Sequence, residues 1–241
     1  MRIREATSHE DLDEVAKIQV EVWNVEDIDI ASRIILRASQ HAGGAVLVAE
    51  ADDGAIAGFA WAFPAYEHGE TFWHSDMLAV RPAYRAGRIG QALKWAQRDR
   101  ALEMGLRRIT WTFDPMQARN AHLNLELLGA TTCQYLDNFY GVTTSDLHHG
   151  LPTDRLLASW DLTSPRVEAR ARGIAPARPA ATATVRVPPE WNALVARDPG
   201  EARREQARAA RDLKGAFAGG LTAIGFDKAS ASYLLSPAKP S

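Results

Sequence analysis

Cysteine is almost absent from this chain of 241 residues, in which Cys133 is the single example. One cysteine excludes a disulfide bond within the chain, and this usage is typical of a reducing compartment. Long apolar runs are also absent, since no run approaches the roughly 20 residues that span a membrane. The first residues, Met1-Arg2-Ile3-Arg4-Glu5, lack the apolar core of a secretory signal. We therefore expect a cytoplasmic protein with no membrane partner.

An excess of charge of one sign is missing as well. The formal net charge is −2, with 24% charged and 46% hydrophobic residues, which is typical of a globular chain with a sizeable core. Balanced charge argues against attraction to nucleic acid. A metal site is not expected either, because the pair His148 and His149 lacks further ligands at a convincing spacing.

A turn of small and cationic residues joins an apolar strand to a helix between residues 78 and 93. The first N–H groups of a helix have no partner within the helix and carry partial positive charge, so they bind anions. Gly87 and Gly90 have no Cβ and allow close approach to the main chain. Arg85 and Arg88 add guanidinium groups that suit phosphate oxygens. This turn predicts a phosphate-binding pocket, and its alternative is an ordinary strand-to-helix turn.

Around this turn the sequence resembles the GNAT superfamily of acyl-CoA-dependent N-acyltransferases, whose central motif reads roughly Val-x-Pro-x-Tyr-Arg-Gly-x-Gly-Ile-Gly. The matching positions are Val80, Pro82, Tyr84, Arg85, Ile89 and Gly90. The resemblance implies a loop that binds the pyrophosphate of coenzyme A, and a preceding strand whose amides bind the pantetheine arm and the oxyanion. The implied loop residues are Arg85, Ala86, Gly87, Arg88, Ile89 and Gly90, and the implied strand residues are Leu78, Ala79 and Val80.

Three positions depart from the family's pattern. Ala86 and Arg88 stand where the family has glycine. Arg88 either turns outward at a negative φ and contacts phosphate, which we favour, or crowds the loop. Ala121 and Gly129 match a second family pattern, Ala-x-x-x-Tyr-x-x-x-Gly, but Leu125 replaces the tyrosine that protonates the departing thiolate. The family's usual general acid is therefore missing from its usual place.

The order of predicted elements also resembles the GNAT fold, over about residues 1–162. Capping patterns, turn residues and hydrophobic periodicity predict each element. They are a strand at 2–6, a helix capped by Thr7-Ser8, a helix at 30–40, strands at 45–49, 56–63 and 72–80, a helix ending near Met104, a strand at 107–113, a helix from Asp114 to Gly129 and a strand at 130–136. The resemblance implies an α/β (α+β) fold, with a mixed, mostly antiparallel twisted sheet flanked by helices.

Acyl transfer to an amine needs a base, because an amine with a pKa of about 10 is protonated at neutral pH. Asp76 and His74 alternate with Ser75 on one strand and therefore share a face. Their alternatives are a hydrogen-bonding residue at a strand end and a structural histidine. Tyr140 is the candidate acid, with an aromatic core residue as its alternative. Asn120 is a candidate for contacting the cofactor, or else a polar residue facing solvent.

The aromatic side chains near the predicted strands either shape an apolar acceptor pocket or belong to the core. They are Trp61, Phe63, Tyr66, Phe72 and Trp73. Beyond the predicted domain, residues 163–189 are rich in alanine, arginine and proline and are expected to form a linker. Residues 190–241 are predicted to form a helix at 201–217 and a hairpin at 220–226 and 232–235, which completes or extends the sheet.

The resemblance, together with these patterns, implies an N-acetyltransferase that moves an acetyl or related acyl group from acetyl-CoA to a small-molecule or peptide amine by direct attack. It needs no metal and acts as a monomer or homodimer. Leu125 and Arg88 motivate an alternative, a catalytically silent protein that binds or senses acyl-CoA. A nucleic-acid-binding accessory protein that uses the arginine-rich tail is a third hypothesis, and the balanced charges of residues 201–214 count against it.

Overall fold

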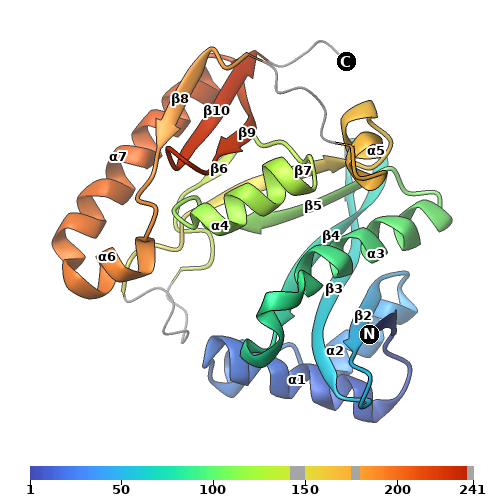
Figure 1. Cartoon of the computed structure of the whole chain (residues 1–241). Coiled ribbons are helices and arrows are strands. Elements are labelled where there is room, and N and C mark those ends of the chain that lie inside the picture. Colours follow the sequence, from blue (N-terminus) through green and yellow to red (C-terminus); the bar gives the residue numbers. More distant parts are fainter. Residues whose placement is uncertain (142–149, 175–179, 238–241) are drawn as a thin grey trace. The chain divides into compact units, whose positions relative to one another are not determined.

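The computed structural model describes residues 1–141, 150–174 and 180–237 (Figure 1). The chain forms two compact units: the first runs Met1–Trp111, and the second holds the described residues from Thr112 onward. This division falls inside the range 1–162 that the sequence groups into one domain. The pair His148 and His149 lies outside the described residues.

The first unit contains a sheet with strand order β1-β2-β3-β4-β5, whose first four strands run antiparallel. Strand β5 runs parallel to β4. The elements are β1 (Arg2–Glu5), α1 (His9–Trp23), the 3-10 turn η1 (Asp27–Asp29), α2 (Arg33–His41), β2 (Ala45–Glu50), β3 (Ile56–Glu67), β4 (Glu70–Val80), the 3-10 turn η2 (Pro82–Gly87), α3 (Ile89–Glu103) and β5 (Arg108–Phe113). The mixed α/β fold with mostly antiparallel strands and flanking helices is confirmed.

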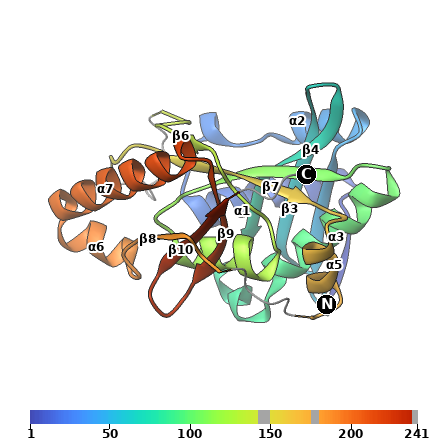
Figure 2. The same ribbon diagram turned by 90° about the horizontal axis from the view of Figure 1, so that it is seen from above.

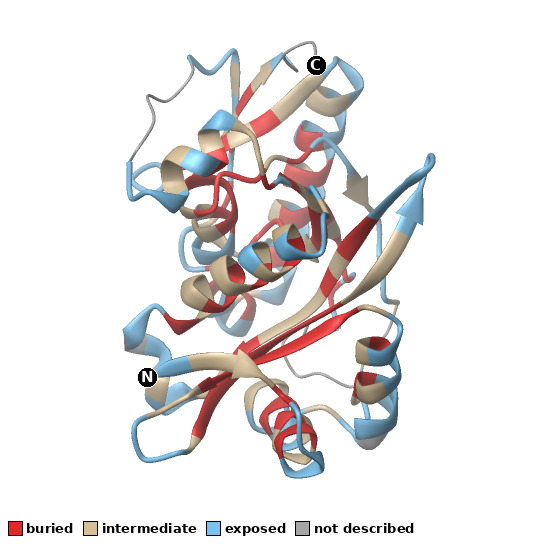
Figure 3. Ribbon diagram, turned by 90° about the vertical axis from the view of Figure 1, so that its right-hand side faces the viewer, coloured by how far each residue is buried: buried red, intermediate tan, exposed pale blue. Residues whose placement is uncertain are grey.

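Helices cover both faces of this sheet, which explains why its central strands are apolar on both sides. Leu12 and Val15 of α1 and Leu36 of α2 belong to the core on one face. Ile89 and Leu93 of α3 belong to the core on the other face. Figure 3 shows the resulting band of buried residues along β2, β3 and β4.

The start of α1 follows from the predicted cap. The Ser8 side chain accepts a hydrogen bond from the Asp11 N–H, and the Asp11 carboxylate accepts one from the Ser8 N–H. This reciprocal capping box satisfies donors that the helix itself leaves without acceptors. Arg4 on β1 donates to both Asp11 oxygens at 2.8 Å, which ties the cap to the sheet.

The second unit combines helices with two sets of strands. Strands β6 and β7 pair antiparallel, and a three-stranded antiparallel sheet has the order β8-β10-β9, whose strands lie side by side in Figure 2. The elements are α4 (Ala118–Ala121), the π-helix η3 (His122–Leu127), β6 (Tyr135–Leu136), β7 (Arg155–Asp161), α5 (Pro165–Ala171), β8 (Ala183–Arg186), α6 (Trp191–Arg197), α7 (Pro199–Ala218), β9 (Leu221–Asp227) and β10 (Ser232–Pro237).

The helix predicted from Asp114 differs from the expectation at its start and in its winding. The Asp114 carboxylate accepts a hydrogen bond from the Met116 N–H and closes a turn, so the helix begins later, at Ala118. After one α-helical turn the winding changes to the π form. The predicted end is confirmed, because Gly129 has a φ of +80°, which glycine adopts without strain.

Parts of the C-terminal region also differ from the expectation. The range 163–189, expected to be a linker, contains α5 and β8. The predicted helix and hairpin are present as α7, β9 and β10, but these strands form a sheet with β8. A single bridge between Thr132 and Ala223 joins β9 to the segment after Gly129. Of the strand expected at 130–136, only Tyr135–Leu136 is formed, as β6. Of the helices in the described part of the chain, none combines the length and hydropathy that crossing a bilayer requires.

Candidate active site

Strand β4 carries a β-bulge at Asp76. Met77 lies opposite Trp61 on β3 and Ser75 lies opposite Ala62, so Asp76 is the extra residue that has no opposite position. A bulge bends a strand and re-aims the side chain at that point, and bulges are frequent beside active sites. The sequence does not reveal this bulge, because it depends on the register between two strands.

Just before the bulge, β4 and β5 stop pairing. Their parallel register covers Trp73 opposite Ile109 and His74 opposite Thr110. We call the end of this pairing the strand fork. Past it, the β4 positions 78–80, predicted to bind the pantetheine arm, keep their partners on β3 and have no paired partner on the described part of β5. The edge of β4 beyond the strand fork therefore has backbone groups that a ligand can bind.

His74 lies at the strand fork. Its Nδ1 is 3.0 Å from the Thr110 hydroxyl oxygen, and its ring centroid is 5.4 Å from that of Phe63 on β3. Burial lowers the pKa of the imidazole, and the positive charge of Lys94 lowers it further. The imidazole is therefore neutral at neutral pH and able to accept a proton.

Asp76 lies two positions further along β4. Because Asp76 is the extra residue of the bulge, simple alternation does not fix the face on which its side chain lies, whereas the preceding Ser75 bonds α3. Burial raises the pKa of the Asp76 carboxyl above its ordinary value. Both predicted bases thus lie on β4, one at the bulge and the other two residues before it, and a shared face stays a prediction.

The predicted phosphate turn consists of η2, Arg88 and the first turn of α3. Arg88 has a φ of +54°, so the expectation of a negative φ is wrong, and the residue occupies the left-handed region that favours glycine. No described side chain caps α3, so the first-turn amides of Ile89 and Gly90 are open to a ligand. Ile89 itself is buried in the core beneath α3.

Small and cationic side chains surround these amides. A Cβ on Gly87 would meet only Ile89 within 4 Å, and one on Gly90 would meet Leu78 and Val80 at 3.7 Å or more. Both positions therefore leave space beside the main chain. Arg85 is exposed and donates from Nε to the Val80 carbonyl at 3.3 Å. The backbone of Ala86 belongs to η2.

The remaining predicted residues belong to the second unit. Tyr140 is 42% exposed, so it is not a core residue, and its hydroxyl lies 2.8 Å from the Thr112 hydroxyl. Its ring packs edge-on against Phe139. Asn120 is exposed on α4. Leu125, at the position of the family's tyrosine, is completely buried on η3.

Most of the predicted aromatic group is core. Trp61, Phe72 and Trp73 are buried, and Trp73 donates from its indole to the Gly43 carbonyl. Tyr66 is 73% exposed near the end of β3. Phe63 is half-buried and contacts His74, so it is the member of the group that lies at the candidate site.

Sequence reasoning missed a buried polar cluster behind β4. Lys94 on α3 is 2% exposed and donates from Nζ to the Ser75 hydroxyl oxygen at 2.9 Å. Ser75 donates to the Gln97 carbonyl oxygen at 2.9 Å. The spacing of Leu93, Gln97 and Ala101 by four residues could have revealed that Gln97 faces the core. A lysine in a helix normally indicates a solvent-facing position, so nothing in the sequence indicated that Lys94 is buried.

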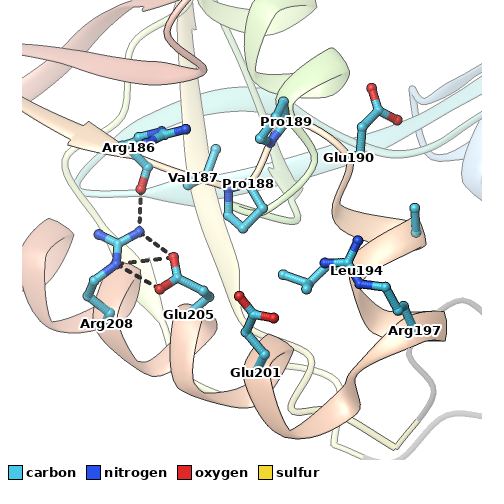
Figure 4. Close-up of a pocket in the computed structure, with 11 residues that line it drawn as sticks. Arg186, Val187, Pro188, Pro189, Glu190, Leu194, Arg197, Glu201, Glu205 and Arg208 are labelled. Atoms are coloured by element: carbon cyan, nitrogen blue, oxygen red, sulfur yellow. Dashed lines mark hydrogen bonds and ion pairs between the residues drawn. The ribbon is translucent and has the colours of Figure 1, made fainter.

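The second unit has a cavity of about 570 Å³ where β8, α6 and α7 meet (Figure 4). Val187, Pro188 and Leu194 supply its apolar lining. Arg208 pairs with Glu205 and also donates to the Arg186 carbonyl, so part of the charge around the cavity is compensated. None of the predicted site residues lines it. Among the described residues there is no group of histidine, cysteine and acidic side chains arranged to hold a metal ion.

Comparison with known proteins identifies the family. Among curated proteins, no match was found. The structure is similar to a GNAT superfamily phosphinothricin acetyltransferase from Sinorhizobium meliloti in complex with AcCoA, with a TM-score of 0.52, 20% identity, and coverage of 66% of this chain and 86% of that one. It is also similar to a ribosomal-protein-alanine N-acetyltransferase from Brucella melitensis, with a TM-score of 0.51, 22% identity, and coverage of 66% and 98%.

A third similar structure is an aminoglycoside 6'-acetyltransferase type Ii, with a TM-score of 0.53, 19% identity, and coverage of 68% of this chain and 99% of that one. At these identities the solved structures establish the fold. The family model described as acetyltransferase (GNAT) family matches residues 9–129, which is half of the 241 residues. The chain therefore belongs to the GNAT family of acetyltransferases.

Proposed function

We propose that this acyl-CoA-dependent N-acetyltransferase performs direct transfer to an amine at the strand fork of β4, with coenzyme A held by the turn between Arg85 and Gly90. The observation that carries this proposal is the combination, within one unit, of an uncapped helix start and a bulged strand whose edge is open. Amides at the first supply positive partial charge for a pyrophosphate, and amides along the second are suited to a pantetheine arm and an oxyanion.

The residues of the turn fit a diphosphate. Gly87 and Gly90 leave space beside the main chain, and both Arg85 and Arg88 are exposed. Arginine forks bind phosphate oxygens in pairs of hydrogen bonds. Arg88 is exposed to solvent, which supports the hypothesis that it contacts phosphate.

For the chemistry, we assign the base to β4. The neutral imidazole of His74 accepts the proton of the attacking amine, or the Asp76 carboxylate does so, because burial makes it a stronger base than an ordinary carboxylate. The nitrogen attacks the thioester carbon, the oxyanion is held by β4 amides, and collapse breaks the carbon–sulfur bond. The thiolate that leaves is then protonated, and the candidate for this acid stays Tyr140, as the sequence predicts, because a phenol needs no shifted pKa for that step.

The acceptor in this proposal is a small-molecule or peptide amine. Aminoglycoside and ribosomal-protein alanine acetyltransferases are named among the similar structures, which supports an amine acceptor without choosing between these kinds. Phe63 beside His74 favours an acceptor whose amine is carried on an apolar or aromatic body.

The test measures free thiol released from acetyl-CoA with a panel of amines. We expect turnover with at least one amine. Of the variants His74→Asn and Asp76→Asn, the one that removes the base should lower kcat by roughly 10²- to 10⁴-fold. His9→Asn is the matched control, because His9 is exposed at the start of α1. Wild-type rates in both β4 variants would contradict the assignment of the base.

A second candidate function is a silent protein that binds acyl-CoA without transfer. The buried Leu125 at the position of the family's thiolate-protonating tyrosine favours it. Under this alternative, coenzyme A binds and no amine of the panel releases thiol. Tyr140→Phe gives a further test of the acyltransferase function, because it lowers kcat only if the phenol is the acid.

A further inference from the structure

Two side-chain contacts lie on opposite faces of the sheet at the strand fork. On one face, His74 contacts Thr110 at 3.0 Å. On the other face, the next residue of each strand contacts Lys94: its Nζ is 2.9 Å from the Ser75 hydroxyl oxygen and 3.8 Å from the centroid of the Trp111 ring. Lys94 thus bridges β4 and β5 directly behind His74.

This lysine is unusual because its ammonium is buried and held on both sides. The Ser75 oxygen accepts one N–H, and the Trp111 ring face attracts the cation. Lysine is almost never fully buried in proteins unless it is paired, and buried titratable groups cluster at functional sites. Burial lowers the pKa of Lys94 to about 7. The Lys94 side chain therefore still carries its proton in the pH range where the His74 imidazole titrates.

Among the described residues of the first unit, Lys94 is the cation whose charge acts on His74. Strands β3 and β5 present Phe63 and Thr110, which do not titrate in this range. The titratable neighbour on β4 itself is Asp76. Helix α1 also packs against β4, but its carboxylates that reach that side, Glu14 and Glu21, both pair with Arg81 at the end of the strand.

We propose that Lys94 is a positioning residue for acetyl transfer: held by Ser75 behind the strand fork, its ammonium excludes a proton from His74 and keeps the imidazole ready to accept the proton of the amine. This inference rests on the proposed function. Lys94 forms and breaks no covalent bond in the reaction. The proton leaves the attacking nitrogen for the imidazole and passes from there to solvent.

The direction of the effect follows from the charges. Removing a positive charge near an imidazole makes protonation easier, so the pKa of His74 rises. Because activity requires a neutral His74, the acidic limb of the pH profile of kcat then moves to higher pH. Lys94→Met removes the charge and keeps the length of the side chain. Lys17→Met is the matched control, because Lys17 is 71% exposed on α1.

Two readouts test the proposal on the full chain. Carbon-13 labelled histidine reports the pKa of His74 by NMR, with His74→Asn to assign its signal, and thiol release from acetyl-CoA reports the pH profile of kcat. In Lys94→Met we expect both the pKa of His74 and the acidic limb to move upward, by on the order of half a pH unit or more. Lys17→Met should leave both unchanged. Ser75→Ala frees Nζ and should give a smaller shift in the same direction, which keeps the test available if Lys94→Met does not fold.

A pKa of His74 that is the same in wild type, Lys94→Met and Ser75→Ala overturns the inference, whatever the rates are. A raised pKa with an unmoved acidic limb also overturns it. A full rate in His74→Asn is a different result, since it rejects His74 as the base and therefore the proposed function on which the inference rests. The NMR readout needs no turnover, so these failures can be distinguished.

Discussion

At the scale of single residues, Arg88 has the most unusual backbone in the candidate site. Its φ of +54° places a side chain with a Cβ in the left-handed region, which costs roughly 1–2 kcal/mol for residues other than glycine. Proteins keep such strain mainly where function requires it. In our account, the function here is contact between the guanidinium and the phosphates of coenzyme A.

We therefore predict opposite effects of one substitution on stability and on binding. Arg88→Gly should raise the free energy of unfolding by about 1 kcal/mol, because glycine adopts this φ without strain. The same variant should bind coenzyme A more weakly and with a smaller dependence on salt. Calorimetric titration and chemical denaturation measure the two quantities. Arg88→Ala is the matched control, since it loses the same charge and keeps the strain. Equal affinity in all three proteins would contradict a phosphate contact.

Lys94 gives a second prediction at this scale, on stability and pH. Its pKa of about 7 in the folded protein is below the ordinary value for lysine of 10.5, so the unfolded chain binds more protons between these values. The free energy of unfolding should therefore rise as the pH increases from about 7 toward 10. Lys94→Met should flatten this rise, and Lys17→Met should preserve it. Urea denaturation at several pH values checks this, and an equal slope in wild type and Lys94→Met would refute the burial of the charge.

At the scale of elements, the start of α1 depends on one carboxylate. Asp11 caps the helix, and its carboxylate accepts hydrogen bonds from both terminal guanidinium nitrogens of Arg4. Hydrogen bonds from Arg4, with further ones from the Thr7 and Ser8 amides, hold the pKa of Asp11 at about 2 despite its burial.

A carboxyl group whose pKa is lower in the folded than in the unfolded protein stabilises the fold at pH values above its unfolded pKa. This stabilisation is lost as the pH falls through the folded pKa. We predict that Asp11→Asn lowers the free energy of unfolding by about 2 kcal/mol at neutral pH, and that the difference from wild type disappears between pH 4 and 2. Asp13→Asn on the exposed side of α1 is the control. A difference that persists at pH 2 would show that the ion pair is not its cause.

The π-helix η3 is held by a buried ion pair in the second unit. One Glu126 oxygen accepts the Phe226 N–H at 2.9 Å, and the other accepts from Arg170 on α5 at 3.2 Å. The carboxylate is 6% exposed, and a Cβ on Gly225 would lie only 2.7 Å from it. The backbone of β9 thus approaches closely enough to fix this side chain, which explains glycine at that position.

Breaking this pair should destabilise the unit. Arg170→Met removes one partner of a buried carboxylate, and we expect a loss of about 3 kcal/mol in the free energy of unfolding. Arg172→Met, at the exposed end of the same helix, should change it by less than about 0.5 kcal/mol. Thermal denaturation of both variants checks this. Equal melting temperatures would mean that the ion pair does not hold η3.

At the scale of the whole molecule, the features that the sequence predicted correctly are local ones. The Ser8 cap, the Gly129 helix end and the strand, turn and helix around Arg85 each depend on a few neighbouring residues. Local chemistry decides such features, so one sequence is enough to find them. The family resemblance rested on this local motif and on the order of the predicted elements over residues 1–162.

The features that it missed depend on residues far apart in the chain. The bulge at Asp76 arises from pairing with β3, and the burial of Lys94 from packing of α3 on two strands. Strand β8 lies in a segment whose composition is typical of a linker, and it becomes a strand because β10 pairs with it. Tertiary contacts override local composition in each case.

The most direct test of the central claim is the affinity of coenzyme A, measured by calorimetric titration of wild type, Gly87→Ala and Gly90→Ala. Neither added methyl has a close protein contact, so both variants should fold normally and bind coenzyme A on the order of tenfold more weakly. Gly215→Ala, on the open surface of α7, should bind as wild type does. If coenzyme A fails to bind the wild type, or binds all of these proteins equally, the turn before α3 is not its phosphate site.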